Sequence, residues 1–198
     1  MDTRILQFWN WFVHNEAIFR DKTQAEKAQE MLNNQVLTFG KFAWGIDEGQ
    51  QKPYVFTISP NNDRQLYKIS QQLIKYAPSL ANWDFRSCKP PIKDWDFKFQ
   101  AYNNFFLLDT YDAAKWHFVL IEEEDYRVSI EIQANNIANL DREDQVIAAQ
   151  RVVTNILGEQ LYIEEVYGVN IVPEFDPRDK DWIYPLSELR KRFLYFIE

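Results

Sequence analysis

The feature that most constrains the fold is a strict alternation of apolar and polar residues between positions 126 and 134. The apolar set is Tyr126, Val128, Ile130, Ile132 and Ala134, and one polar residue separates each pair. Successive side chains of a strand point to opposite faces, so this pattern predicts a strand with one buried face. Residues 116–121 are apolar except for His117, and the acidic residues 122–125 join the two segments. The sequence therefore predicts an antiparallel hairpin with an acidic tip.

Other segments have the spacing of amphipathic helices. Apolar residues recur every three or four positions in residues 3–33, 63–77, 141–157 and 185–197. Further extended patterns occupy residues 36–44, 54–58, 83–88, 95–99, 105–108 and 161–172. The run 105–108 is continuously apolar, so we expect it to be buried on both faces, and we expect a bulge at Gly168. Because the strands cluster in the middle of the chain, the order predicts an α+β fold, with a mostly antiparallel β-sheet and about four helices packed on it.

The composition is that of a packed protein. Of the 198 residues, 46% are hydrophobic, and 15 Phe, 10 Tyr and 7 Trp side chains supply large buried areas. No repeat or linker stands out, so we expect a single α+β domain over residues 1–198, with its weakest possible seam near residues 135–141.

Net charge limits the kinds of partner that we expect, and apolar runs and cysteine content limit the compartment. The formal charge of −8 disfavours binding to nucleic acid or anionic lipid, and the basic run 190–192 is read as a complement to the negative end of a helix. No run of about 18 apolar residues and no signal-peptide pattern occurs, so no membrane association is expected. The single cysteine, Cys88, excludes an intrachain disulfide, and the cytoplasm is the expected location.

Motifs for cofactors or metals are missing from the sequence. The five glycines form no phosphate-binding loop, which argues against a nucleotide cofactor. His14, Cys88 and His117 are far apart along the chain, and no carboxylates have the spacing of a calcium loop. We therefore expect no cofactor, no metal site and no recognisable catalytic residues.

Five residues remain as candidate binding residues: Asn15, Glu16, Trp83, Trp95 and His117. Glu16 lies on the apolar stripe of the first helix, where a carboxylate needs a hydrogen bond, a cation or a cleft. The alternative is that Glu16 forms a structural ion pair. His117 interrupts an apolar strand, and Trp83 and Trp95 lie in strand or loop positions where they would be either core residues or interface anchors.

Two elements resemble those of a group of bacterial cytoplasmic proteins of unknown activity. Residues 11–19 have the form W-F-x-x-N-E-x-x-F, in which Asn15 and Glu16 are fixed, and residues 77–83 have the form A-P-x-L-x-x-W, which ends at Trp83. The resemblance covers about the first hundred residues. It implies no activity, cofactor or substrate.

Three functions stay open. The favoured hypothesis is a protein-binding, regulatory or immunity-type factor whose acidic surface meets a basic protein partner. The alternative is a small-molecule hydrolase-type enzyme with a carboxylate and histidine acid-base pair, for which Glu16, His117 or Tyr residues in a cleft are the candidates. A structural subunit of an oligomer is the third hypothesis, because the sequence leaves the oligomeric state open.

Overall fold

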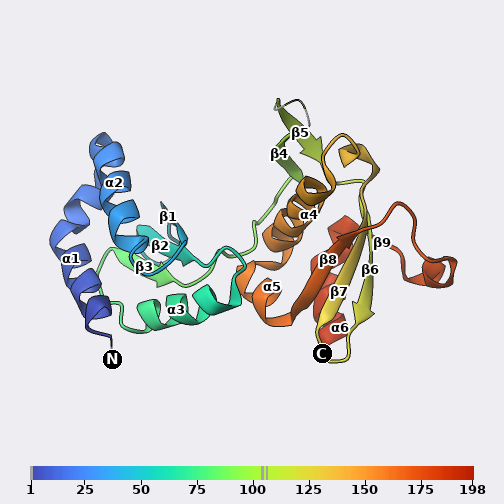
Figure 1. The fold of residues 1–198 in the computed structure, drawn as a ribbon. Helices are drawn as coiled ribbons and strands as arrows, with labels where there is room; N and C mark the ends of the chain where they lie inside the picture. Colours follow the sequence, from blue (N-terminus) through green and yellow to red (C-terminus); the bar gives the residue numbers. More distant parts are fainter. Residues whose placement is uncertain (1, 104, 106) are drawn as a thin grey trace. The chain divides into compact units, whose positions relative to one another are not determined.

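The structure is a computed structural model that describes residues 2–103, 105 and 107–198 (Figure 1). Contacts divide the chain into two compact units, residues 1–89 and 90–198. Both units combine helices with small sheets, so the predicted α+β class is confirmed. The finer prediction of a single domain is not confirmed. Each unit is described by itself below.

The first unit packs helices on a three-stranded sheet. Its elements are α1 (Thr3–Arg20), α2 (Ala25–Val36), β1 (Ala43–Glu48), β2 (Tyr54–Ser59), α3 (Arg64–Lys75) and β3 (Trp83–Arg86). The sheet has the order β1-β2-β3, in which β1 is antiparallel and β3 is parallel to β2. The crossover through α3 brings β3 beside β2 in the parallel direction.

The segment predicted as one helix over residues 3–33 is divided at Asp21. The Asp21 carboxylate accepts hydrogen bonds from the Thr23 amide and hydroxyl and from Gln24 Nε2. These bonds start a short 3-10 turn, Lys22–Gln24, before α2 begins. An Asp side chain that bonds nearby amides competes with the regular helix, which explains the interruption. The α2 helix then runs to Val36, so the strand predicted from residue 36 begins instead at Ala43.

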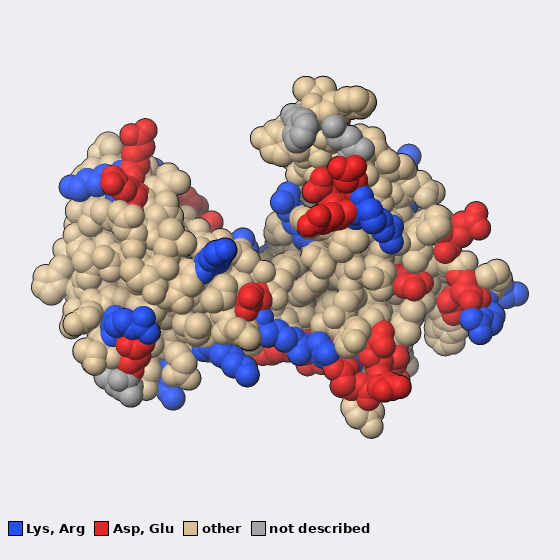
Figure 2. All heavy atoms as spheres, in the orientation of Figure 1, with Lys and Arg blue, Asp and Glu red and all other residues tan. Residues whose placement is uncertain are grey.

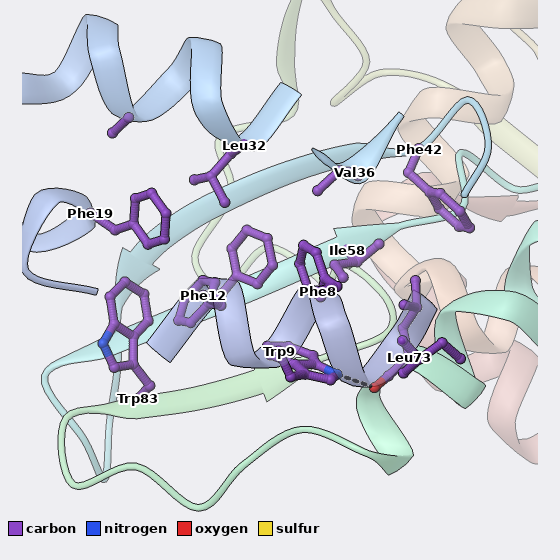
Figure 3. Close-up of a cluster of buried hydrophobic side chains, with 13 residues drawn as sticks. Phe8, Trp9, Phe12, Phe19, Leu32, Val36, Phe42, Ile58, Leu73 and Trp83 are labelled. Atoms are coloured by element: carbon purple, nitrogen blue, oxygen red, sulfur yellow. Dashed lines mark hydrogen bonds between the residues drawn. The ribbon is translucent and has the colours of Figure 1, made fainter. Parts of the chain in front are cut away.

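Aromatic side chains fill the core of the first unit (Figure 3). Phe12 is fully buried, and its ring lies within 5.1 Å of the rings of Phe19 and Trp83, measured between centroids. The indole Nε1 of Trp9 donates a hydrogen bond of 2.8 Å to the Leu73 carbonyl of α3. The α1 helix is thus tied to both the sheet and α3.

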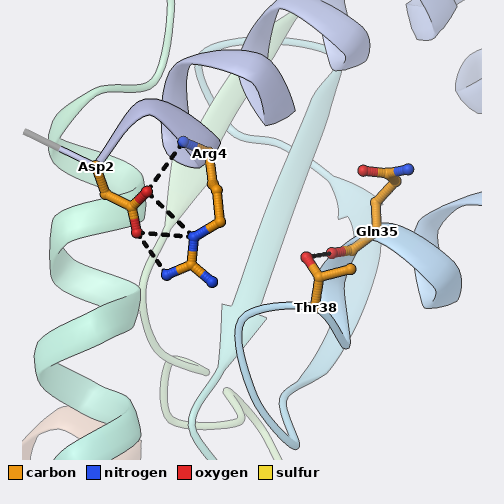
Figure 4. A network of polar contacts seen from close by, with 4 residues as sticks. All are labelled: Asp2, Arg4, Gln35 and Thr38. Atoms are coloured by element: carbon orange, nitrogen blue, oxygen red, sulfur yellow. Dashed lines mark hydrogen bonds and ion pairs between the residues drawn. The ribbon is translucent and has the colours of Figure 1, made fainter.

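Local polar contacts stabilise the start of α1 and the end of α2 (Figure 4). Asp2 caps α1, because its carboxylate accepts from the Arg4 amide at 3.0 Å and from the Arg4 guanidinium at 2.6 Å. The Arg4 guanidinium and this hydrogen bonding hold the pKa of Asp2 below its usual value. Thr38 Oγ1 donates to the Gln35 carbonyl at 2.6 Å just after α2 ends.

The second unit contains two sheets and three α-helices among its described residues. Its elements are β4 (Lys98–Tyr102), β5 (Leu108–Asp112), β6 (His117–Glu122), β7 (Val128–Gln133), α4 (Arg142–Leu157), α5 (Glu159–Glu165), β8 (Val166–Ile171), β9 (Tyr184–Pro185) and α6 (Leu189–Ile197). The β4 and β5 strands form a two-stranded sheet, and the other sheet has the order β8-β7-β6-β9. The β7 and β8 strands are parallel, and the crossover between them contains α4 and α5.

The predicted acidic-tipped hairpin is confirmed as β6 and β7. The expected irregularity near Gly168 is present as well, since Val128 pairs with Val166 while Ser129 pairs with Gly168. The prediction that residues 161–172 are all extended is wrong. Gly158, with φ of +86°, ends α4. A second helix, α5, starts at Glu159 and buries Tyr162 and Ile163 before β8 starts.

The sheet arrangement also differs from the prediction. Among the described residues, strands form three small sheets instead of one, and two of the pairings, β2 with β3 and β7 with β8, are parallel. Helices exceed the predicted four, because the first predicted helix is divided and α5 was not foreseen. Which strands pair depends on contacts between distant segments, and hydrophobic periodicity does not report them.

Candidate functional site

Glu16 and Asn15 are both engaged within α1. The Glu16 carboxylate lies 3.5 Å from the Arg20 guanidinium, one turn further along the helix, and about a third of each side chain is exposed. Asn15 Nδ2 donates to the Trp11 carbonyl at 2.8 Å. Arg20 therefore supplies the cation that a structural ion pair of Glu16 requires.

Trp83 belongs to the core of the first unit. Its side chain is 0% exposed and packs against Phe12 and Tyr54, each with ring centroids 5.1 Å away. Its Nε1 finds no hydrogen-bond acceptor among the described residues. In this state of the molecule the ring is not accessible as an interface anchor.

Trp95 and His117 lie in the second unit. Trp95 is half-buried and donates from Nε1 to the Lys98 carbonyl at 3.1 Å. His117 is exposed at the start of β6, where it borders a pocket of about 480 Å³ with Asn135 and Asn136. The Asn136 side chain is already bonded to the Trp116 indole and to the Asp112 carbonyl.

The proposed acid-base pair is divided between the units, since Glu16 belongs to residues 1–89 and His117 to residues 90–198. Neither unit by itself contains the pair. Over the described part of the chain, no group of three or more His, Cys, Asp or Glu side chains is placed to hold a metal ion. Within the same residues, no helix has the length and apolar character that crossing a bilayer requires.

An exposed apolar surface appears where the sequence predicted burial. Four residues of the β4–β5 hairpin, here called the hairpin patch, are largely exposed: Tyr102 (62%), Phe105 (80%), Leu107 (62%) and Leu108 (51%). The expectation that 105–108 is buried on both faces is wrong for its described residues, and Phe106 lies outside them.

Asn103 explains why this run forms a turn. Its Oδ1 accepts from the amides of Phe105 and Leu107 at 2.9 and 3.1 Å, and its Nδ2 donates to Asp109 at 2.7 Å. An Asn that bonds amides two to four residues on is a turn signal, and the sequence contains it at positions 103–104.

Beside the hairpin patch lies a groove of about 680 Å³ between β4–β5 and α4, here called the hairpin groove. Tyr102 and Leu108 line it from the hairpin, and Ile147 and Arg151 line it from α4. Arg151 donates to the Gln100 carbonyl at 3.0 Å, which closes the outer edge of β4 against the helix. Within the part of the chain that the structure describes, β5 has a strand neighbour on one side only.

Charge is unevenly divided along the chain. Residues 1–89 contain 11 Lys or Arg and 9 Asp or Glu, whereas residues 90–198 contain 11 and 21. The formal charges are thus +2 for the first unit and −10 for the second. On the face that Figure 2 shows, Asp and Glu side chains are spread over the second unit. The acidity predicted for the whole protein therefore resides in the second unit.

The basic run 190–192 is used structurally. Arg190 Nη1 donates to the Leu157 carbonyl at 2.6 Å, at the end of α4. Arg192 pairs with Glu188 at 2.8 Å and lies 4.0 Å from the centre of the Tyr184 ring. The prediction that the run complements the negative end of its own helix is wrong, because residues 190–192 lie in the first turn of α6; Arg190 instead complements the negative end of α4.

The first unit has a groove of its own, of about 780 Å³, between the end of α1, the start of α2 and the strands β1 and β2. We call it the helix-strand groove. Phe19, Trp44 and Tyr54 form its aromatic walls, and Arg20 and Lys22 carry its positive charges. The sequence analysis did not find this groove, because its residues come from four separate segments.

No protein-family model, curated protein or solved structure matches this chain in the comparisons, so the geometry above is the basis for assigning a function.

Proposed function

We propose that this protein is a protein-binding factor whose second unit takes up a basic, extended segment of a partner protein. The observation that carries the proposal is the hairpin patch, in which four large apolar side chains are more than half exposed on one hairpin. An exposed apolar cluster beside a groove is typical of an interaction surface.

The charge of the second unit selects the kind of partner. A unit of formal charge −10 attracts a cationic segment and repels an acidic one. Asp109 and Asp112 lie on β5 itself, and Asp144 borders the hairpin groove. A bound segment that carries Lys or Arg beside apolar anchors fits both properties.

The open side of β5 favours an extended segment. A strand with one strand neighbour can accept another along its second side, and backbone hydrogen bonds then supply affinity while side chains supply specificity. The β4 edge is already occupied by Arg151 and Trp95. On β5 the Asp112 carbonyl accepts from Asn136, so the part of β5 before Asp112 remains for such pairing.

A selection from a displayed library of random peptides tests the proposal, with the full chain as bait. We expect enriched peptides to combine Lys or Arg with apolar residues and to bind more weakly as salt is raised, because exposed charges are screened. Amide hydrogen exchange should show protection of residues 98–112 on binding. Failure to enrich any peptide, or protection confined to other segments, would contradict the proposal.

A matched pair of variants localises the surface. Phe105 and Tyr195 are both 80% exposed in the second unit, on the hairpin and on α6 respectively. We expect Phe105→Ser to raise the Kd of the selected peptides at least tenfold and Tyr195→Ser to leave it unchanged. If sedimentation shows instead a dimer that Phe105→Ser dissociates, the patch serves self-association and the proposal is wrong.

A further inference from the structure

The aromatic side chains that line the helix-strand groove are fixed by contacts with residues outside the groove. Trp44 Nε1 donates to Asn33 Oδ1 at 2.8 Å, which fixes the indole against α2. Tyr54 packs on the buried Trp83 ring at 5.1 Å, and Phe19 packs on Phe12 at 5.0 Å. Walls that are ordered before a ligand arrives lose little conformational entropy on binding.

Arg20 is an incompletely hydrogen-bonded cation at this groove. Its only described partner is Glu16, at the long distance of 3.5 Å, and its Nε is buried with no acceptor among the described residues. A guanidinium has five donors, so most of its hydrogen-bonding capacity is unused. About a third of the side chain is exposed, which leaves the guanidinium within reach of a ligand.

The neighbouring carboxylate does not neutralise Arg20. Asp21 is occupied by the amide and hydroxyl of Thr23 and by Gln24, and these hydrogen bonds hold the pKa of Asp21 below its usual value. Lys22 adds a second positive charge on the same side of the groove. The helix side of the groove therefore presents Lys22 and Arg20; Asp21 is engaged with Thr23 and Gln24, and Glu16 contacts Arg20 through a single oxygen at 3.5 Å.

We propose that the helix-strand groove binds a small aromatic compound that carries one carboxylate. The aromatic body lies between Phe19, Trp44 and Tyr54, and the two carboxylate oxygens accept from the planar fork of Arg20. The volume of about 780 Å³ is that of a site for a small molecule.

The strand side of the groove limits the charge of the ligand. Asp47 and Glu48 border the groove at the end of β1, and both are exposed. Two further carboxylates repel a polyanion such as a nucleotide di- or triphosphate. A monoanion held at the helix side is compatible with them.

Ligand-observed NMR and calorimetry on the full chain test this site with three probes that share one ring system. They are indole-3-acetate, its neutral amide indole-3-acetamide, and the cation tryptamine. We expect indole-3-acetate to bind at least tenfold more tightly than the other two, because they lack the charged acceptor. Equal binding of acid and amide, preferred binding of tryptamine, or no binding at millimolar concentration would overturn the proposal. This comparison needs no variant, so it holds even where a substitution disturbs folding.

Variants of α1 then identify the recognising cation. Arg20→Gln should lose the tenfold preference for the acid, and Arg20→Lys should retain part of it as a point charge without the fork. Arg4→Gln is the matched control at the other end of the same helix, and its ion pair with Asp2 is exposed. Unchanged affinity in Arg20→Gln with an intact far-UV CD spectrum would refute the assignment. The site lies wholly in the first unit, so the result is independent of peptide binding by the second.

Discussion

Two buried tryptophans of the first unit offer a direct test of its hydrogen bonding. Trp9 and Trp83 are 3% and 0% exposed and belong to the same core, so replacement of either by Phe removes a similar apolar area. Their indole nitrogens differ, because Trp9 Nε1 donates to the Leu73 carbonyl and Trp83 Nε1 finds no acceptor among the described residues.

The expected difference follows from these two nitrogens. Trp9→Phe loses a hydrogen bond worth about 1 kcal/mol, whereas Trp83→Phe removes an unpaired donor whose burial costs about 1–3 kcal/mol. The Leu73 carbonyl still accepts from the Tyr76 amide at 3.3 Å, so it is not left without a partner. We therefore expect Trp9→Phe to lower the free energy of unfolding by about 2 kcal/mol more than Trp83→Phe.

Urea unfolding followed by far-UV circular dichroism measures both values. Hydrogen exchange at the buried β2 amides assigns the transition to the first unit, because those amides open only when its sheet does. Equal losses in the two variants, or a larger loss in Trp83→Phe, would refute the reasoning and show that Trp83 Nε1 is paired in solution.

Two further predictions concern the second unit. Arg190→Gln should lower the free energy of unfolding by about 1 kcal/mol in a thermal or urea melt, because Arg190 caps the Leu157 carbonyl, whereas the exposed neighbour Lys191→Gln should change it little. The Arg178 guanidinium lowers the pKa of Asp176 to about 2, so Arg178→Gln should raise it towards 3.8 in a carboxyl NMR titration. Since the folded pKa lies below the unfolded value, the stabilisation is present above about pH 4 and is lost as the pH falls towards 2; an unchanged pKa in the variant would contradict this cause.

The division of charge changes how the acidity of this protein is interpreted. A net charge of −8 for the whole chain predicts one acidic surface, but the first unit has a formal charge of +2. The two proposals follow this division. We propose a basic partner for the acidic second unit and a small anion for the cations of the first.

Patterns between residues close along the sequence predict part of the candidate site. Glu16 and Arg20 are four residues apart on one helix, which is the spacing of an ion pair, and the sequence analysis required a cation for Glu16 without naming it. The Arg190 contact with Leu157 spans 33 residues and had no such local signal. The relationship that residues 11–19 and 77–83 suggest, to a group of proteins of unknown activity, stays a prediction.

The sequence by itself determined the α+β class, the β6–β7 hairpin and the starts of α3 and α4 after Asp63 and Asp141, because periodicity acts between residues close along the chain. The predicted side-chain cap is present at Asp63, whereas the Asp141 side chain makes no cap hydrogen bond. Only the tertiary structure decided that the strands form three sheets, that residues 105 and 107–108 are exposed at a hairpin end, and that four segments meet at the helix-strand groove. These features depend on which distant surfaces exclude water together, and an apolar run has the same pattern whether a neighbour covers it or not.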